Sequence, residues 1–234
     1  YPDEVEKIDT NKAIKKTDKS KVTIGPPESM SKSKKNTVDP EIMINQYGAD
    51  AVRWFILSDS PPEKDIQWSD SGVSSANKFL QKIWNLNFLI INRKEPKNTT
   101  KEDEKKFSSK INYYTNKIDS AINEFKFNVA IANFYEVYKF FRDQIDCKIK
   151  NKILIENVTK IMKLLIPFTP HLAYECLEHL KCKSINKWPE IEKNMISEIK
   201  LAIQVNGKTR DIINIDENLM EKDINNIVFN NTKT

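Results

Sequence analysis

Residues 127–145 read FNVAIANFYEVYKFFRDQI, and the expected fold follows from this stretch. Its apolar side chains recur every three or four residues, at Phe127, Ala130, Ile131, Phe134, Val137, Tyr138, Phe141 and Ile145. Side chains with this spacing lie on one face of an α-helix. The stretch therefore predicts an amphipathic helix whose aromatic face is buried.

The same spacing recurs on both sides of this stretch. It predicts further helices over about residues 72–92, 107–122, 152–165 and 170–181, with a polar, proline-containing linker at 94–103. Amphipathic helices joined by short polar segments pack as antiparallel neighbours. The expected fold is therefore mainly α, an antiparallel helical bundle.

Two shorter helices are predicted before the bundle. The first has Asp39 as its N-cap, Pro40 at its first position and Gly48 as a left-handed C-terminal cap. The second begins at Asp50 and ends before Pro61. The side chains expected to face inward are Ile42, Met43, Tyr47, Val52, Phe55 and Ile56. Residues 1–28 lack clear periodicity, apart from one short strand predicted at 21–24.

The pattern changes after the bundle. Residues 200–205 and 209–215 alternate apolar and polar side chains around Asn206-Gly207, which is a strong hairpin signal. A short helix is predicted at about 219–227. Because an isolated hairpin is marginally stable in water, we expect this segment to begin a small α+β C-terminal domain.

Composition narrows the class of protein. The net charge of +5 favours a polyanionic partner without requiring one, and only 4 glycines argue against a Gly-rich nucleotide-binding fold. The 3 cysteines form no disulfide framework, and no apolar run approaches the roughly 20 residues of a membrane span. A reducing, cytosolic compartment is expected.

The first candidate site is the run SMSKSKKN at residues 29–36, which contains no acid. A turn at Gly25-Pro26-Pro27 precedes it, and a helix start follows it. A mobile cationic loop between anchored ends suits a polyanion that is bound and then released. When an acyl-adenylate forms, ammonium groups stabilise the charge that grows on the leaving pyrophosphate. The alternative is a solvated lysine run.

The second candidate site is a basic flank that could neutralise RNA phosphates. Its members are Lys126, Lys139, Arg142, Lys148, Lys150 and Lys152. The aromatic side chains of residues 127–141 could also stack against bases, although their helical spacing favours packing in the core. The alternative for the flank is that its lysines only solvate a helix face.

The cysteines and histidines of the last helix invite comparison with a zinc site. The spacing of His171, Cys176, His179 and Cys182 matches no common Cys/His site, and Cys176 falls in an apolar stripe. We expect no metal there, with Cys176 in the core and His171 serving the first turn of the helix.

Several of these residues together resemble class I aminoacyl-tRNA synthetases. Residues 29–33 (SMSKS) are similar to the K-M-S-K-S signature. Asp39-Pro40 and residues 47–53 (YGADAVR) match its continuation in the leucyl, isoleucyl, valyl and methionyl enzymes. Residues 167–171 (PFTPH) resemble the segment that opens a late helix of the same group's anticodon-binding bundle.

Within this group, three features favour the leucyl enzymes. Lys34-Lys35-Asn36 stands where isoleucyl and valyl enzymes usually read x-Gly-Asn. Residues 68–73 (WSDSGV) and 204–210 (QVNGKTR) are similar to leucyl motifs, the second from the bacterial C-terminal domain. One departure is Ser29, which replaces the first signature lysine, whereas the second is retained as Lys32.

The resemblance implies specific roles. Lys32 is the expected catalytic residue, and the expected ATP-binding residues are Ser29, Met30, Ser31, Lys32 and Ser33. The whole enzyme would use ATP with Mg²⁺, leucine and tRNA(Leu), as a cytoplasmic monomer without membrane contact. The family's H-I-G-H element and amino-acid pocket are missing, so we expect a C-terminal fragment that binds no cofactor and is inactive alone.

The expected organisation has three parts. These are the signature loop with stem-contact helices at 1–72, the tRNA-binding bundle at 73–190 and a partial C-terminal domain at 191–234. Two alternatives stay open: a fragment of an isoleucyl or valyl enzyme, and a non-catalytic helical module that binds RNA or acts as a scaffold.

Overall fold

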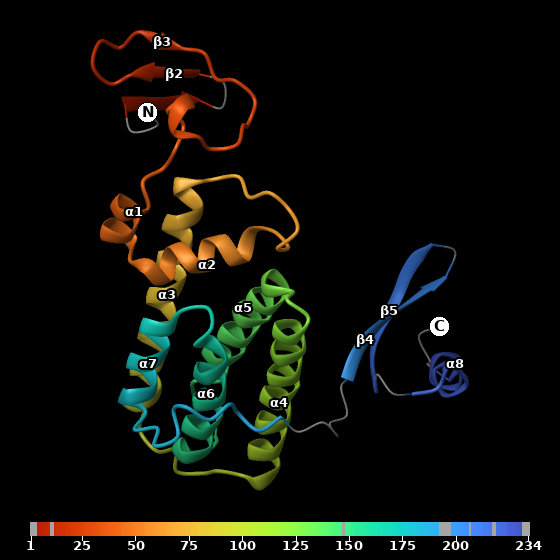
Figure 1. Ribbon diagram of the computed structural model, residues 1–234. Helices are drawn as coiled ribbons and strands as arrows, with labels where there is room; N and C mark the ends of the chain where they lie inside the picture. Colours follow the sequence, from red (N-terminus) through yellow and green to blue (C-terminus); the bar gives the residue numbers. More distant parts are fainter. Residues whose placement is uncertain are drawn as a thin grey trace.

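The computed structural model describes residues 4–9, 12–146, 148–191, 198–205, 207–216 and 219–230. Five helices form the bundle: α3 (Asp70–Ile91), α4 (Lys101–Asn123), α5 (Phe127–Asp143), α6 (Asn151–Leu165) and α7 (Pro170–His179). Helices α4 to α7 lie below the shorter α1 (Pro40–Tyr47) and α2 (Ala49–Asp59), whereas α3 begins above α2 and runs past it into the bundle (Figure 1). The prediction of a mainly helical bundle is confirmed. Among the described residues, no helix has both the length and the apolarity of a membrane span.

The centre of the core is an aromatic cluster around Trp54 of α2, which is fully buried. Its ring centroid lies 5.4 Å from that of Phe79, 5.9 Å from Phe134 and 6.3 Å from Phe168. These rings come from α3, from α5 and from the corner between α6 and α7. Tilted and edge-on aromatic pairs at such distances add to the burial of apolar area. The cluster therefore joins α2 to the bundle.

The inward faces of the two short helices differ from the prediction. In α2 the buried apolar side chains are Ala51, Trp54 and Phe55, whereas the predicted Ile56 is 42% exposed. In α1 no residue is buried, and Ile42 is 51% exposed. The predicted N-cap is confirmed, because the Asp39 side chain accepts from Glu41 N at 2.9 Å. Gly48 ends α1 as predicted, with a positive φ of 84°, but its ψ of 151° is outside the left-handed helical region that was predicted.

The N-terminal segment contains more strand than its sequence indicates. Strands β1 (Val5–Asp9), β2 (Lys12–Lys15) and β3 (Lys21–Val22) form an antiparallel sheet in the order β1-β2-β3. Only the strand at 21–24 was predicted, and β3 lies within it; β1 and β2 were not predicted. The strands are charged on most positions, so their apolar periodicity is weak; Ala13 is the buried apolar residue that they contribute.

The C-terminal hairpin is confirmed. Strand β4 (Glu198–Val205) pairs with β5 (Lys208–Asp216) in antiparallel register, with Val205 opposite Lys208. Gly207 has a φ of 76°, the positive value that such a tight turn requires. Asn206 of the predicted turn lies outside the described residues. Helix α8 (Glu221–Phe229) follows, close to the predicted position.

The start of α3 explains the WSDSGV run. Ser69 caps the helix by accepting from Gly72 N at 3.2 Å, and the Trp68 indole donates to Asp70 at 2.8 Å. The Trp68 ring packs edge-on against Phe55 at 5.4 Å. A Cβ atom on Gly72 would lie 2.4 Å from the Phe55 ring. Glycine therefore lets α2 and α3 approach each other closely.

We predict that Gly72→Ala destabilises the chain by about 1–3 kcal/mol, because the buried Phe55 ring must move to admit the methyl group. The measurement is the free energy of unfolding in urea. Gly25→Ala is the matched control, since nothing lies within 4 Å of a Cβ there. Equal stability of the Gly72→Ala and Gly25→Ala variants would contradict the proposed close packing.

Candidate functional site

The lysine run folds into a short, exposed turn. Residues Lys32–Lys34 form one turn of 3-10 helix, which Ser31 precedes in extended conformation and Lys35 ends with a φ of 53°. Ser31 is half-buried, whereas the other four residues of 29–33 are exposed. The loop thus presents its side chains to solvent, where a ligand can reach them.

The lysines of this turn differ in their partners. Lys34 forms an ion pair with Glu28 at 2.5 Å, and its ammonium group lowers the pKa of the Glu28 carboxyl group. Among the described residues, no carboxylate pairs with the Lys32 side chain, which is exposed. Lys32 therefore carries a positive charge that is available to an anionic ligand. An exposed pair such as Lys34–Glu28 is weak, so a polyphosphate could displace Glu28.

The segments at 47–53 and 167–171 meet in space. Asp50 of α2 accepts from Leu172 N at 2.7 Å and lies 2.9 Å from the His171 Nδ1 atom. Arg53 donates to the carbonyl oxygens of Pro167 and Phe168, at 2.6 and 3.0 Å. Asp50, and not His171, accepts from the first turn of α7, whereas the predicted role was assigned to His171, which contacts Asp50. These contacts attach the loop-bearing segment to the corner between α6 and α7.

The structure does not bring the six residues of the predicted basic flank together. Lys126 precedes α5, whereas Lys139 and Arg142 lie near its other end, about 20 Å away at 1.5 Å per residue. Lys126 also pairs with Glu124 at 2.6 Å, which raises the pKa of Lys126. Lys126 therefore lies apart from the other five residues, and tRNA binding by the flank stays a prediction.

The remaining flank residues lie around the joint between α5 and α6. Two of them meet acids, because Lys150 lies 4.0 Å from Glu104 and Lys152 lies 3.9 Å from Glu156. Arg142 donates to the Tyr138 hydroxyl group. Lys148 lines a hollow of about 360 Å³ between this joint and α4.

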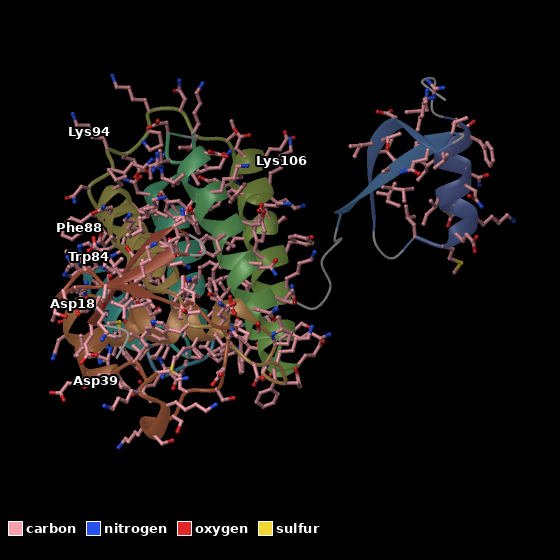
Figure 2. The ribbon with its side chains drawn as sticks, turned by 90° about the horizontal axis from the view of Figure 1, so that it is seen from above. Asp18, Asp39, Trp84, Phe88, Lys94 and Lys106 are labelled. Atoms are coloured by element: carbon pink, nitrogen blue, oxygen red, sulfur yellow. The ribbon has the colours of Figure 1, made fainter. Side chains whose placement is uncertain are left out.

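Two of the lysines that line this hollow, Lys106 and Lys110, were not predicted from the sequence. It is lined by Asp103, Lys106, Phe107, Lys110, Phe140, Gln144, Lys148 and Ile149. Lys106 and Lys110 are one helical turn apart on α4, and Figure 2 shows Lys106 on the side of the bundle away from Trp84 and Phe88. Their spacing on the polar face of α4 was the available signal. The same spacing is typical of a solvated helix face, and only the fold shows that Lys148 lies across the hollow from Lys106 and Lys110.

The histidines of the last helix lie against different partners. His171 lies beside Asp50, whereas the His179 ring packs at a tilt of 46° against Trp84, with centroids 5.0 Å apart. Cys176 is fully buried, and burial raises the pKa of its thiol to about 12. In the part of the chain that the structure describes, no three His, Cys, Asp or Glu side chains are grouped as metal ligands.

Comparison with protein families assigns the class. Residues 104–225 match the anticodon-binding domain of tRNA ligases, which is just over half of the chain. The chain belongs to this family. Residues 22–69, which contain the lysine turn, α1 and α2, match the class I tRNA synthetases of the I, L, M and V group.

Similar proteins narrow the class further. The chain is 35% identical to a leucine–tRNA ligase of Azorhizobium caulinodans, and the match covers 92% of the chain and 27% of that protein. It is 36% identical to that of Rickettsia bellii, over 98% of the chain and 28% of that protein. The chain thus spans about a quarter of the length of these relatives.

A solved structure of a leucyl-tRNA synthetase complex is also similar to this chain. The crystal structure of a ternary LeuRS–tRNA–LeuAMS complex of Agrobacterium radiobacter aligns with a TM-score of 0.69 and 26% identity. The alignment covers 87% of this chain and 28% of that one.

Proposed function

We propose that the chain is the C-terminal part of a leucine–tRNA ligase, an enzyme that activates leucine with ATP and transfers it to tRNA(Leu). The observation that carries this proposal is the exposed Lys32, which has no carboxylate partner among the described residues. Its loop leads into α1 and α2, and Asp50 and Arg53 connect α2 to an anticodon-binding bundle. The names of the relatives favour leucine over isoleucine and valine.

In the proposed reaction, Lys32 acts on the triphosphate of ATP. The leucine carboxylate attacks the α-phosphorus, the bond to the bridging oxygen breaks, and pyrophosphate leaves with the electron pair. The Lys32 ammonium group stabilises the charge that grows on pyrophosphate and transfers no proton. Ser29, Met30, Ser31 and Ser33 shape the loop around it, and Mg²⁺ would accompany ATP in the whole enzyme.

The bundle is proposed to hold the tRNA through its phosphates. The strongest support is the lysine group Lys106, Lys110 and Lys148, which lines the hollow together with one acid, Asp103. Lys106 also forms an exposed ion pair with Glu102 at 2.7 Å, which a phosphate could displace. Positive side chains of this kind neutralise a nucleic-acid backbone without reading its sequence. Lys139, Arg142, Lys150 and Lys152 extend the same end of the bundle, and Lys126 is left out of this surface.

The proposed function extends to the domain organisation, oligomeric state and location of the whole enzyme. Residues 1–72 would belong to its catalytic part, 73–190 to the tRNA-binding bundle and 191–234 to a C-terminal domain. The enzyme would be a cytoplasmic monomer. Without an H-I-G-H element or an amino-acid pocket, the chain alone would not activate leucine.

We predict that Lys32→Ala in the full-length enzyme lowers kcat for leucine-dependent ATP–pyrophosphate exchange by roughly 100-fold or more, because one preorganised charge contact contributes about 2.7–4 kcal/mol to a transition state. The KM for leucine should change little. Lys64→Ala, an exposed lysine outside the loop, is the control. The assignment fails if Lys32→Ala retains full exchange while Lys34→Ala abolishes it.

A second prediction concerns RNA binding by the chain itself. Its affinity for tRNA should fall as salt rises, and Lys106→Gln with Lys110→Gln should reduce the slope of log K against log salt by about two. Fluorescence anisotropy at several salt concentrations measures this. The matched pair Lys78→Gln with Lys82→Gln, on α3, should leave the slope unchanged. Salt-independent binding would mean that the bundle is a scaffold and does not contact RNA phosphates.

A further inference from the structure

The side chain of Asn36 makes two hydrogen bonds across the lysine turn. Its Oδ1 atom accepts from Ser31 N at 2.7 Å, and its Nδ2 atom donates to the Ser29 carbonyl oxygen at 3.2 Å. Both Asn36 and Ser31 are half-buried, unlike the exposed lysines between them. The amide therefore pairs with the backbone of residues 29–31 much as a neighbouring strand would.

These two hydrogen bonds, called the Asn36 clasp below, hold the backbone where the 3-10 turn begins. Ser31 is the N-cap of the 3-10 turn whose first residue is Lys32, so fixing the Ser31 amide fixes the backbone next to Lys32. The Ser31 and Ser33 hydroxyl groups, 2.8 Å apart, bond to each other across the same turn. The Lys34–Glu28 pair lies on its other side. The turn is thus tied internally, while the Lys32 side chain stays exposed.

The clasp also fits the unusual residue at position 29. Asn36 bonds to the backbone carbonyl of Ser29 and not to its side chain. The replacement of the first signature lysine by Ser29 therefore leaves these two hydrogen bonds intact. The geometry that presents Lys32 can persist without that lysine.

We propose that Asn36 is the positioning residue that presents Lys32 to the triphosphate, an inference that rests on the proposed function. Asn36 contacts no reacting atom and acts only through the backbone of the turn. Its amide supplies one acceptor and one donor at once, which few side chains can do. Aspartate would keep the acceptor but lose the donor, and it would set a carboxylate against the Ser29 carbonyl oxygen.

The first test uses the 234-residue chain. Amide hydrogen exchange of Ser31, followed by NMR, should be at least tenfold faster in Asn36→Ala than in the unsubstituted chain. Asn45→Ala, an exposed position on α1, is the matched control and should leave Ser31 unchanged. Equal exchange of Ser31 in Asn36→Ala and in the unsubstituted chain would overturn the clasp.

The second test uses the full-length enzyme and separates two steps. Asn36→Ala should lower kcat for leucine-dependent pyrophosphate exchange at least tenfold, with Asn36→Asp between it and the unsubstituted enzyme. The KM for leucine, the melting temperature and the transfer of leucine from preformed leucyl-adenylate to tRNA should stay unchanged. A merely structural role would lower the transfer step or the melting temperature as well, and that result would overturn the inference.

The outcomes separate the inference from the proposed function. If the unsubstituted full-length enzyme shows no leucine-dependent exchange, the proposed function is wrong, and the role of Asn36 falls with it. If that enzyme exchanges leucine and Asn36→Ala does so equally fast, the function stands and the inference is wrong.

Discussion

The buried carboxylate of Asp50 is the contact on which the arrangement of the molecule depends. It is only 8% exposed, and it accepts from Leu172 N in the first turn of α7 while lying beside His171. A carboxylate at a helix N-terminus satisfies free N–H groups and interacts favourably with the helix dipole. Arg53, one turn later on α2, complements it by binding the carbonyl oxygens of Pro167 and Phe168. Helix α2 thus bonds both the carbonyl groups that end the α6–α7 corner and the N–H group in the first turn of α7.

This corner links the two halves of the proposed activity. The loop containing Lys32 and Asn36 reaches α2 through the short helix α1, and α2 is fixed to α7 by Asp50 and to the core by Trp54. Hydrogen bonds set the orientation of the contact, whereas burial of the Trp54 cluster supplies most of its apolar area. Contacts within the chain therefore fix α2 on the bundle, and the lysine turn is joined to α2 through α1.

Sequence patterns predicted what is local. Helix ends follow from adjacent residues, and the lysine turn is visible as a run. The Asp50–Leu172 contact spans 122 residues, so no periodicity indicates it. The sequence pattern placed Ile56 on the inward face of α2 and missed Trp54. The spacing of apolar residues does not identify the buried face of a helix that packs against several partners. The roles of Asn36 and Lys106 depend on neighbours that only the fold brings close.

The most direct test is whether the Asp50 contact holds α2 on the bundle. Native-state hydrogen exchange compares the opening free energies of amides in α2 and in the first turn of α7 with those in α4. In Asp50→Ala, the α2 and α7 amides should open more easily by about 1–3 kcal/mol, because buried donors lose their acceptor. The α4 amides, and all amides in the control Asp59→Ala, should be nearly unchanged. Equal protection of α2 in Asp50→Ala and in the unsubstituted chain would contradict the central role given to Asp50.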